Sequence, residues 1–131
     1  MNKNKGDDHF ERWLMRYGEA WEGKNVQAFS SLFSKDADYY WTPFEKPKCG
    51  PDEIGRAFQA AVESQTEISF AARVIDAGPK NGLAHWTCSF TRINTGANVR
   101  IDGILAVEFD DNDDDKDRAI CFREWWHRDE Q

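Results

Sequence analysis

Residues 97–109 read Ala-Asn-Val-Arg-Ile-Asp-Gly-Ile-Leu-Ala-Val-Glu-Phe, and their side chains alternate in character. From position 99 onward every odd position is apolar or glycine, whereas the even positions include Arg100, Asp102 and Glu108. A period of two is typical of a β-strand that buries one face. We therefore expect a strand here, with its odd-numbered side chains packed under the rest of the chain.

The same period continues across the second half of the chain. Short polar links at residues 78–82 and 94–96 separate the segments and suit hairpins. Consecutive strands joined in this way predict an antiparallel meander. The expected strands are residues 66–77, 82–93, 97–109 and 118–128.

Helical periodicity precedes these strands. Apolar residues recur at spacings of three and four from Phe10 to Trp21, in a helix expected to begin at Asp7 or Asp8. Asn25 can cap a shorter second helix that carries residues 28–33, a short strand is expected at residues 37–41, and Gly50-Pro51 is a good start for a third helix. Helices followed by strands indicate an α+β domain with the helices packed on one face of a sheet.

The composition is that of one folded domain. We expect a disordered N-terminal tail at residues 1–7 and a single domain at residues 8–131, because 40% of the chain is hydrophobic and 14% aromatic. A net charge of −7, without a Lys/Arg cluster, argues against a nucleic-acid partner. No apolar leader or run of roughly 18 apolar residues is present, so we expect a cytoplasmic protein without a membrane segment.

Metal and cofactor signatures are missing from the sequence. The cysteines, at positions 49, 88 and 121, are odd in number and lack a Cys-x-x-Cys spacing. That pattern fits a reduced protein without a zinc site. The acidic run at residues 110–117 lacks the central glycine and terminal glutamate of an EF-hand, which favours a solvated hairpin loop. We expect neither a metal nor a cofactor.

The last strand places a carboxylate among aromatic rings. Alternation through residues 118–128 sends Glu124 and Trp126 to the inner face, with Ile120 and Phe122, and sends Trp125 to the outer face. Burial among apolar groups raises the pKa of a carboxyl group, which suits a general acid or base. The alternative is a structural acid, held by an arginine or satisfied by a tyrosine hydroxyl or a tryptophan N–H.

The outer face mixes apolar and charged residues, as a sheet-mediated dimer interface often does. Trp125 next to Ile104 would be a poor surface for bare solvent, so we expect a homodimer through this face. His85 and His127 fall on the same face and are expected to be interface residues. Asp102 also falls there, unless a bulge beside Gly103 turns it inward.

The order and spacing of several motifs resemble the nuclear transport factor 2-like superfamily, and within it the SnoaL-like domains. The resemblance spans roughly residues 9–128. It implies a cone-shaped α+β fold, in which N-terminal helices pack on a curved, mostly antiparallel sheet that encloses a pocket, often in a dimer. The motifs are Arg16-Tyr17-x-x-Ala20-Trp21, Leu32-Phe33-x-x-Asp36-Ala37, Pro43-Phe44-x-x-Pro47, Gly50, Thr95-Gly96, Val107-Glu108-Phe109-Asp110 and Phe122-Arg123-Glu124-Trp125-Trp126.

The resemblance also gives implied roles. Tyr17 matches the oxyanion-hole tyrosine of steroid isomerases, but their base falls on Trp41 and their second donor on Leu105, which argues against that reaction. Of the three water-activating groups of the epoxide hydrolases, Glu124 matches one, while the other two fall on Trp86 and Cys88. Polyketide cyclases of this fold use an acid on the last strands as base, which again points to Glu124.

We therefore expect a small apolar or aromatic molecule in a tryptophan-lined pocket, with Glu124 as acid or base in a cyclase, isomerase or dehydratase type of reaction. The alternative is a non-catalytic dimeric binding or interaction module of the same fold. The expected catalytic residues are Glu124, Tyr17 and Asp102, and the expected ligand-binding residues are Trp13, Trp21, Tyr39, Trp41, Phe44, Trp86, Cys88, Phe122 and Trp126.

Overall fold

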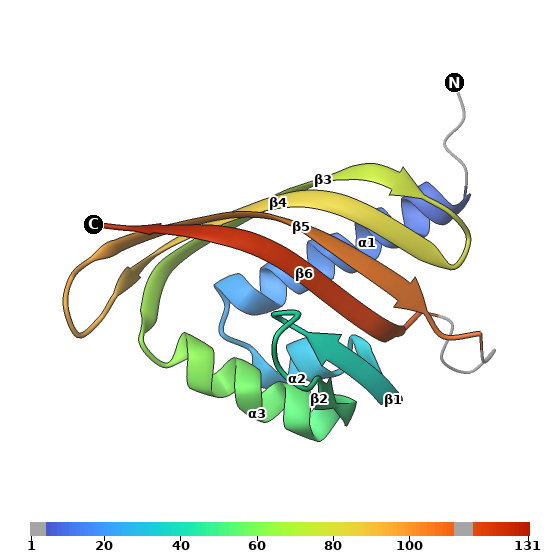
Figure 1. The fold of residues 1–131 in the computed structure, drawn as a ribbon, viewed down its shortest axis with the longest axis horizontal. Helices are drawn as coiled ribbons and strands as arrows, with labels where there is room; N and C mark the ends of the chain where they lie inside the picture. Colours follow the sequence, from blue (N-terminus) through green and yellow to red (C-terminus); the bar gives the residue numbers. More distant parts are fainter. Residues whose placement is uncertain (1–4, 112–116) are drawn as a thin grey trace.

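The structure, a computed structural model, describes residues 5–111 and 117–131 and has the expected α+β architecture. The long strands arch over the first helix, while the other two helices lie beneath the arch (Figure 1). The helices are α1 (Lys5–Glu22), α2 (Val26–Ser30) and α3 (Gly50–Val62). The strands are β1 (Phe33–Tyr40), β2 (Lys48–Cys49), β3 (Gln65–Ala77), β4 (Asn81–Arg92), β5 (Asn98–Phe109) and β6 (Ala119–Glu130).

The sheet has the strand order β2-β1-β6-β5-β4-β3. Strands β3 to β6 pair antiparallel with their neighbours in sequence, which confirms the predicted meander. Strand β1 pairs parallel to β6 and antiparallel to β2, an extension of the sheet that the hairpin pattern did not indicate. This extension brings the end of β1 beside the middle of β6.

Local chemistry explains the helix boundaries. The Asn25 side chain accepts a hydrogen bond from the Ala28 backbone N–H at 3.0 Å, so it caps α2 as expected. Helix α3 begins at Gly50, which has a φ of 81°, and carries Pro51 in its first turn. Helix α2 ends earlier than expected, and Phe33 opens β1 instead of closing the helix.

Helix α1 begins earlier than expected, at Lys5, so Asp7 and Asp8 lie within it and not at its cap. Of the expected disordered tail, residues 1–4 lie outside the described residues. The same holds for residues 112–116 of the acidic loop. None of the helices in the described ranges is long and apolar enough to cross a membrane.

The inner face of the sheet contains the residues that alternation predicted, with one exception at the start of β6. Leu105 pairs with Glu124 and Val107 with Phe122, but Phe109 pairs with Ala119 because the register shifts after Glu108. Ile120 is the extra residue of this bulge, so Ala119, which is fully buried, takes the inward place predicted for Ile120. Alternation resumes beyond the bulge and sends Glu124 and Trp126 inward.

Gly103 permits the close approach that positions Trp126. The two residues pair across β5 and β6, and a side chain at position 103 would collide with the Trp125 carbonyl and with Trp126. The Cα and Cβ atoms of Trp126 can therefore lie close against Gly103 of β5. On the outer face, Trp125 and Ile75 are each 47% exposed. The homodimer through that face stays a prediction.

Candidate functional site

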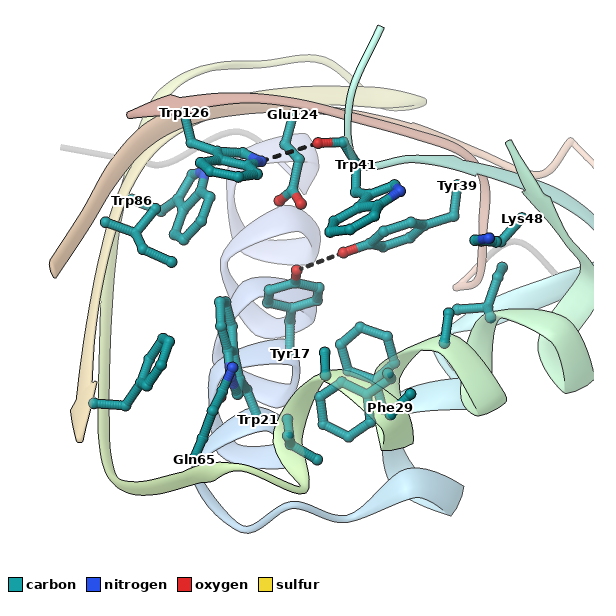
Figure 2. A pocket seen from close by; sticks show the side chains of 18 of the residues that line it. Tyr17, Trp21, Phe29, Tyr39, Trp41, Lys48, Gln65, Trp86, Glu124 and Trp126 are labelled. Atoms are coloured by element: carbon teal, nitrogen blue, oxygen red, sulfur yellow. Dashed lines mark hydrogen bonds between the residues drawn. The ribbon is translucent and has the colours of Figure 1, made fainter. Parts of the chain in front are cut away.

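A cavity of about 510 Å³ lies between the concave face of the sheet, the second half of α1 and helix α3. Its size suits a drug-sized small molecule. Strands β4 and β6 form one wall, α3 the opposite wall, and Tyr17 and Trp21 of α1 the floor (Figure 2). Most of the lining is apolar, and the residues with rings are Tyr17, Trp21, Phe29, Tyr39, Trp41, Phe58, Trp86, Phe90 and Trp126.

Glu124 projects from β6 into this cavity, towards the hydroxyl groups of two tyrosines (Figure 2). Only 7% of the residue is exposed, and its Oε2 has no hydrogen-bond partner within residues 5–111 and 117–131. Burial raises the pKa of the Glu124 carboxyl group to about 8, although a hydrogen bond with Tyr39 acts in the opposite direction. Near neutral pH the carboxyl group is therefore mostly protonated.

The two tyrosines form a hydroxyl pair below Glu124. The hydroxyl oxygens of Tyr17 and Tyr39 are 3.1 Å apart, and Tyr39 also interacts with Glu124. Phe122 stacks on both phenol rings, with centroid distances of 5.4 Å to Tyr17 and 4.5 Å to Tyr39. Burial, followed by nearby ionisable groups, raises the pKa of both hydroxyls well above its usual value. Both therefore serve as hydrogen-bond donors and not as bases.

The tryptophans of the pocket differ in how their N–H groups are used. Trp21 donates to Gln65 Oε1 at 2.9 Å, and Trp126 donates to the Trp41 carbonyl at 2.9 Å. The Nε1 of Trp86 is buried and has no partner in the part of the chain that the structure describes. Because buried polar groups are normally hydrogen-bonded, the Trp86 N–H and Glu124 Oε2 are two buried lining groups that still have a hydrogen bond to offer a ligand.

A family model of the SnoaL-like domain matches residues 14–114. The chain belongs to the SnoaL-like domain family. No curated protein matches the chain. Solved structures of similar fold nevertheless cover almost all of this SnoaL-like domain.

Three of these structures have low sequence identity to the domain, so they show its fold alone. A hexachlorocyclohexane dehydrochlorinase (LinA) Type2 has a TM-score of 0.78 and 9% identity, over 95% of this chain and 87% of that chain. A conserved protein from Planctomyces limnophilus has a TM-score of 0.77 and 18% identity, over 92% of this chain and 95% of that chain. An LEH-like epoxide hydrolase from M. tuberculosis has a TM-score of 0.69 and 13% identity, over 92% of this chain and 84% of that chain.

The SnoaL-like pocket brings together seven of the residues predicted for it. Two more predicted residues, Cys88 and Phe122, are buried behind its wall and do not line it. Burial raises the pKa of the Cys88 thiol to about 12, so this thiol is not a nucleophile near neutral pH. The seven lining residues are Glu124, Tyr17, Trp21, Tyr39, Trp41, Trp86 and Trp126.

Asp102, a predicted catalytic residue, does not line the pocket. Its Oδ1 lies 2.9 Å from His85 Nε2, and its side chain is 68% exposed on the outer face of the sheet. The register between β4 and β5 runs without a break from Asn81 opposite Glu108 to Thr91 opposite Asn98. No bulge therefore turns Asp102 inward, and plain alternation holds.

Trp13 and Phe44 are the other two corrections. Trp13 lies one turn before Tyr17 on α1, is 1% exposed, and donates its N–H to the Leu32 carbonyl at 3.1 Å. It belongs to the filled core and not to the cavity. Phe44 lies between β1 and β2 and is 93% exposed, so it does not contribute to the pocket in this structure.

Sequence reasoning missed one wall and the charged lining of the SnoaL-like pocket. Helix α3 was correctly expected to have an apolar stripe, but a stripe does not reveal whether it meets protein or a cavity. Arg92 and Arg128 have the same strand parity as Phe90 and Trp126, so alternation could have placed them inward. The missed lining residues are Phe29, Lys48, Ile54, Ala57, Phe58, Ala60, Ala61, Val62, Gln65, Phe90, Arg92, Ile101 and Arg128.

Proposed function

We propose that the protein catalyses proton transfer on a small, largely apolar molecule that contains a ring, with Glu124 as the general acid and base. One observation supports this most strongly: a buried carboxyl group, with a pKa of about 8 and an unpartnered Oε2, lies at the wall of a cavity. A pKa near the operating pH lets one group both donate and accept a proton. A purely structural acid would be expected to have partners for both oxygens.

The neighbouring groups suit the two halves of such a cycle. In the protonated form, Glu124 donates its proton to an oxygen atom of the ligand or to a leaving group. The Tyr39 hydroxyl, which interacts with Glu124, stabilises the carboxylate that remains. Tyr17, 3.1 Å from the Tyr39 hydroxyl, supports that donor. The Trp86 N–H offers a second donor to the ligand.

The reaction class follows from this set of groups. One acid/base, two hydroxyl donors and one indole donor suit isomerase, dehydratase or cyclase chemistry, in which protons move without a redox step. Solved structures with the same fold include a dehydrochlorinase and an epoxide hydrolase, which is consistent with a catalytic pocket in this fold. Fold alone does not give the reaction.

Hydrogen–deuterium exchange at the carbon next to the carbonyl of 2-tetralone tests the proposal. This small ring ketone needs only proton transfer, and NMR follows the exchange in deuterated buffer. We expect the protein to accelerate exchange with an inflection near pH 8, and the Glu124→Gln variant to lose roughly 100-fold or more of that acceleration. The matched control is Glu108→Gln, because Glu108 is an exposed acid on the outer face.

If the Glu124→Gln variant kept both the acceleration of exchange and its pH profile, Glu124 would be ruled out as the acid/base. Binding of ring compounds without any acceleration would instead favour a non-catalytic dimeric module. The exposed Trp125 on the outer face supports that second function, since it suits a contact between two copies. Sedimentation of wild type against Trp125→Lys measures whether this face forms a dimer.

A further inference from the structure

The pocket has a charge opposite to that of the whole chain. The protein has a formal net charge of −7, yet Lys48, Arg92 and Arg128 all line the cavity. The acid in the lining is Glu124, which is mostly uncharged near neutral pH because its pKa is about 8. The cationic side chains give the cavity a positive potential. It therefore attracts anions, although the protein as a whole is acidic.

The two arginines lie close together where the strands end. Arg92 is the last residue of β4, and Arg128 lies two residues before the end of β6. The strand that separates them, β5, contributes Ile101 to the lining, and Ile101 pairs with Arg128. Both arginines therefore project from the concave face at the same end of the sheet, beyond Phe90 and Trp126.

The two guanidinium groups share one carboxylate. Arg92 donates two hydrogen bonds to Glu130, from Nε to Oε2 at 3.0 Å and from Nη2 to Oε1 at 3.4 Å, while Arg128 Nε makes a single contact of 3.9 Å with Glu130 Oε1. Two positive charges against one negative charge leave one excess positive charge at this end of the pocket. The outer face differs, because there Arg100 pairs one-to-one with Asp129 at 2.6 Å.

The distance from the acid to the arginines fits a small ring system. Glu124 and Arg128 are four residues apart on β6, so their Cα atoms are separated by roughly 13 Å. The wall between them includes Trp126 on β6 and Trp86 on β4, which lie on either side of Gly103 of β5. A flat ligand of about two fused rings would span this apolar stretch and reach both ends.

We propose that the ligand is a ring-bearing carboxylate, whose carboxylate group binds Arg128 and Arg92 and whose rings extend along Trp86 and Trp126 towards Glu124. Guanidinium groups bind carboxylates through paired hydrogen bonds, which favours this anion. This proposal rests on the proposed function in one respect, the placement of the reacting end of the ligand at Glu124. The carboxylate preference itself depends on the arginines and not on Glu124.

Two probes of equal shape test it: 2-naphthoate and its uncharged carboxamide, each titrated into the protein by calorimetry at pH 7. We expect wild type to bind the carboxylate about 10-fold or more tightly than the amide, and added salt to narrow that ratio. Arg128→Gln and Arg92→Gln should each lower the ratio, and the double variant should bring it close to one. Arg128→Lys should retain part of it, because the charge remains while the paired hydrogen bonds are lost.

The controls separate the two proposals. Arg100→Gln removes the same charge from the outer face and should leave the ratio of affinities unchanged. Glu124→Gln should also leave this ratio unchanged, while the acceleration of proton exchange falls by roughly 100-fold or more. Equal affinity for both probes, a preference that survives the double arginine variant, or binding of neither probe at millimolar concentration overturns the carboxylate proposal. If Lys48→Gln lost the preference for the carboxylate while the arginine variants kept it, the anion would bind at Lys48 on β2. That result would overturn its assignment to the arginines. Absence of proton exchange would contradict the proposed function and would leave the carboxylate proposal standing.

Discussion

The aromatic interior has two halves that are equally buried but differently filled. In the packed half, Trp13 is 1% exposed, its N–H has a carbonyl partner, and the rings of Phe33, Phe109 and Phe122 lie with centroids 5.8 to 6.1 Å from its own. In the open half, Trp86 is 2% exposed, borders the cavity and has an unpartnered N–H. Burial alone therefore does not separate core from site. For these two tryptophans the hydrogen bond of the N–H makes the distinction, since the Trp13 N–H has a partner and the Trp86 N–H has none.

The largest expected effect is on the pH dependence of stability, through Glu124 in the open half. The pKa of its carboxyl group is about 8 in the folded protein against an ordinary value of 4.5, so the folded state binds more protons between these values. The free energy of unfolding therefore falls as the pH rises from about 4.5 to 8, by an amount on the order of 5 kcal/mol, and stays low above that. Urea denaturation at pH 5, 7 and 9 measures this fall.

Glu124→Gln is the control, because the amide does not titrate. It should lack this component of the pH dependence and be more stable than wild type at pH 9. Identical slopes for the two proteins would mean that the acid titrates in the folded state as it does in the unfolded chain, and the contrast between the two halves would lose its electrostatic basis.

A smaller effect is expected when the same substitution is made in each half. Trp13→Phe removes a satisfied hydrogen bond and leaves a void in packed rings, so we expect it to lower the free energy of unfolding by about 2 kcal/mol. Trp86→Phe removes an unpartnered N–H beside an existing cavity, so we expect a loss below about 1 kcal/mol. Chemical denaturation of both variants checks the difference. Equal losses would indicate that the two halves are packed alike.

The smallest effect is expected on the outer face. The Asp102 carboxylate pairs with His85 at 2.9 Å but is 68% exposed, and such pairs contribute little. Asp102→Asn should change stability by less than about 1 kcal/mol and leave the binding of 2-naphthoate unchanged. Denaturation and calorimetry measure the two quantities. A clear loss of binding would return Asp102 to the site and contradict its position in the structure.

Sequence alternation predicted the faces of the sheet well because a strand has only two sides. It placed Glu124 and Trp126 inward and Trp125 outward, as the structure confirms. It failed at Ile120, where a bulge adds one residue, since a bulge depends on the partner strand. It likewise gave no indication that β1 pairs parallel to β6, because that contact joins segments far apart in sequence.

The candidate site was predictable only in part for a similar reason. Helical spacing puts Trp13 and Trp21 on one buried stripe, but it does not say that the first meets Phe33 and the second meets a cavity. That outcome depends on α3, which faces Trp21 across the cavity. Asp102 differed from Glu124 only by strand parity, and including it as a catalytic candidate relied on a bulge that the register excludes.

Helix α3 has a consequence for how such a domain can change its ligand over evolution. Its contribution to the lining includes three alanines, Ala57, Ala60 and Ala61, whereas the ionisable carboxyl group belongs to the hydrogen-bonded sheet. Replacing an alanine by a larger residue reshapes the space for the ligand without disturbing the strand that holds Glu124. Selectivity can therefore diversify on one element while the chemistry is inherited on another.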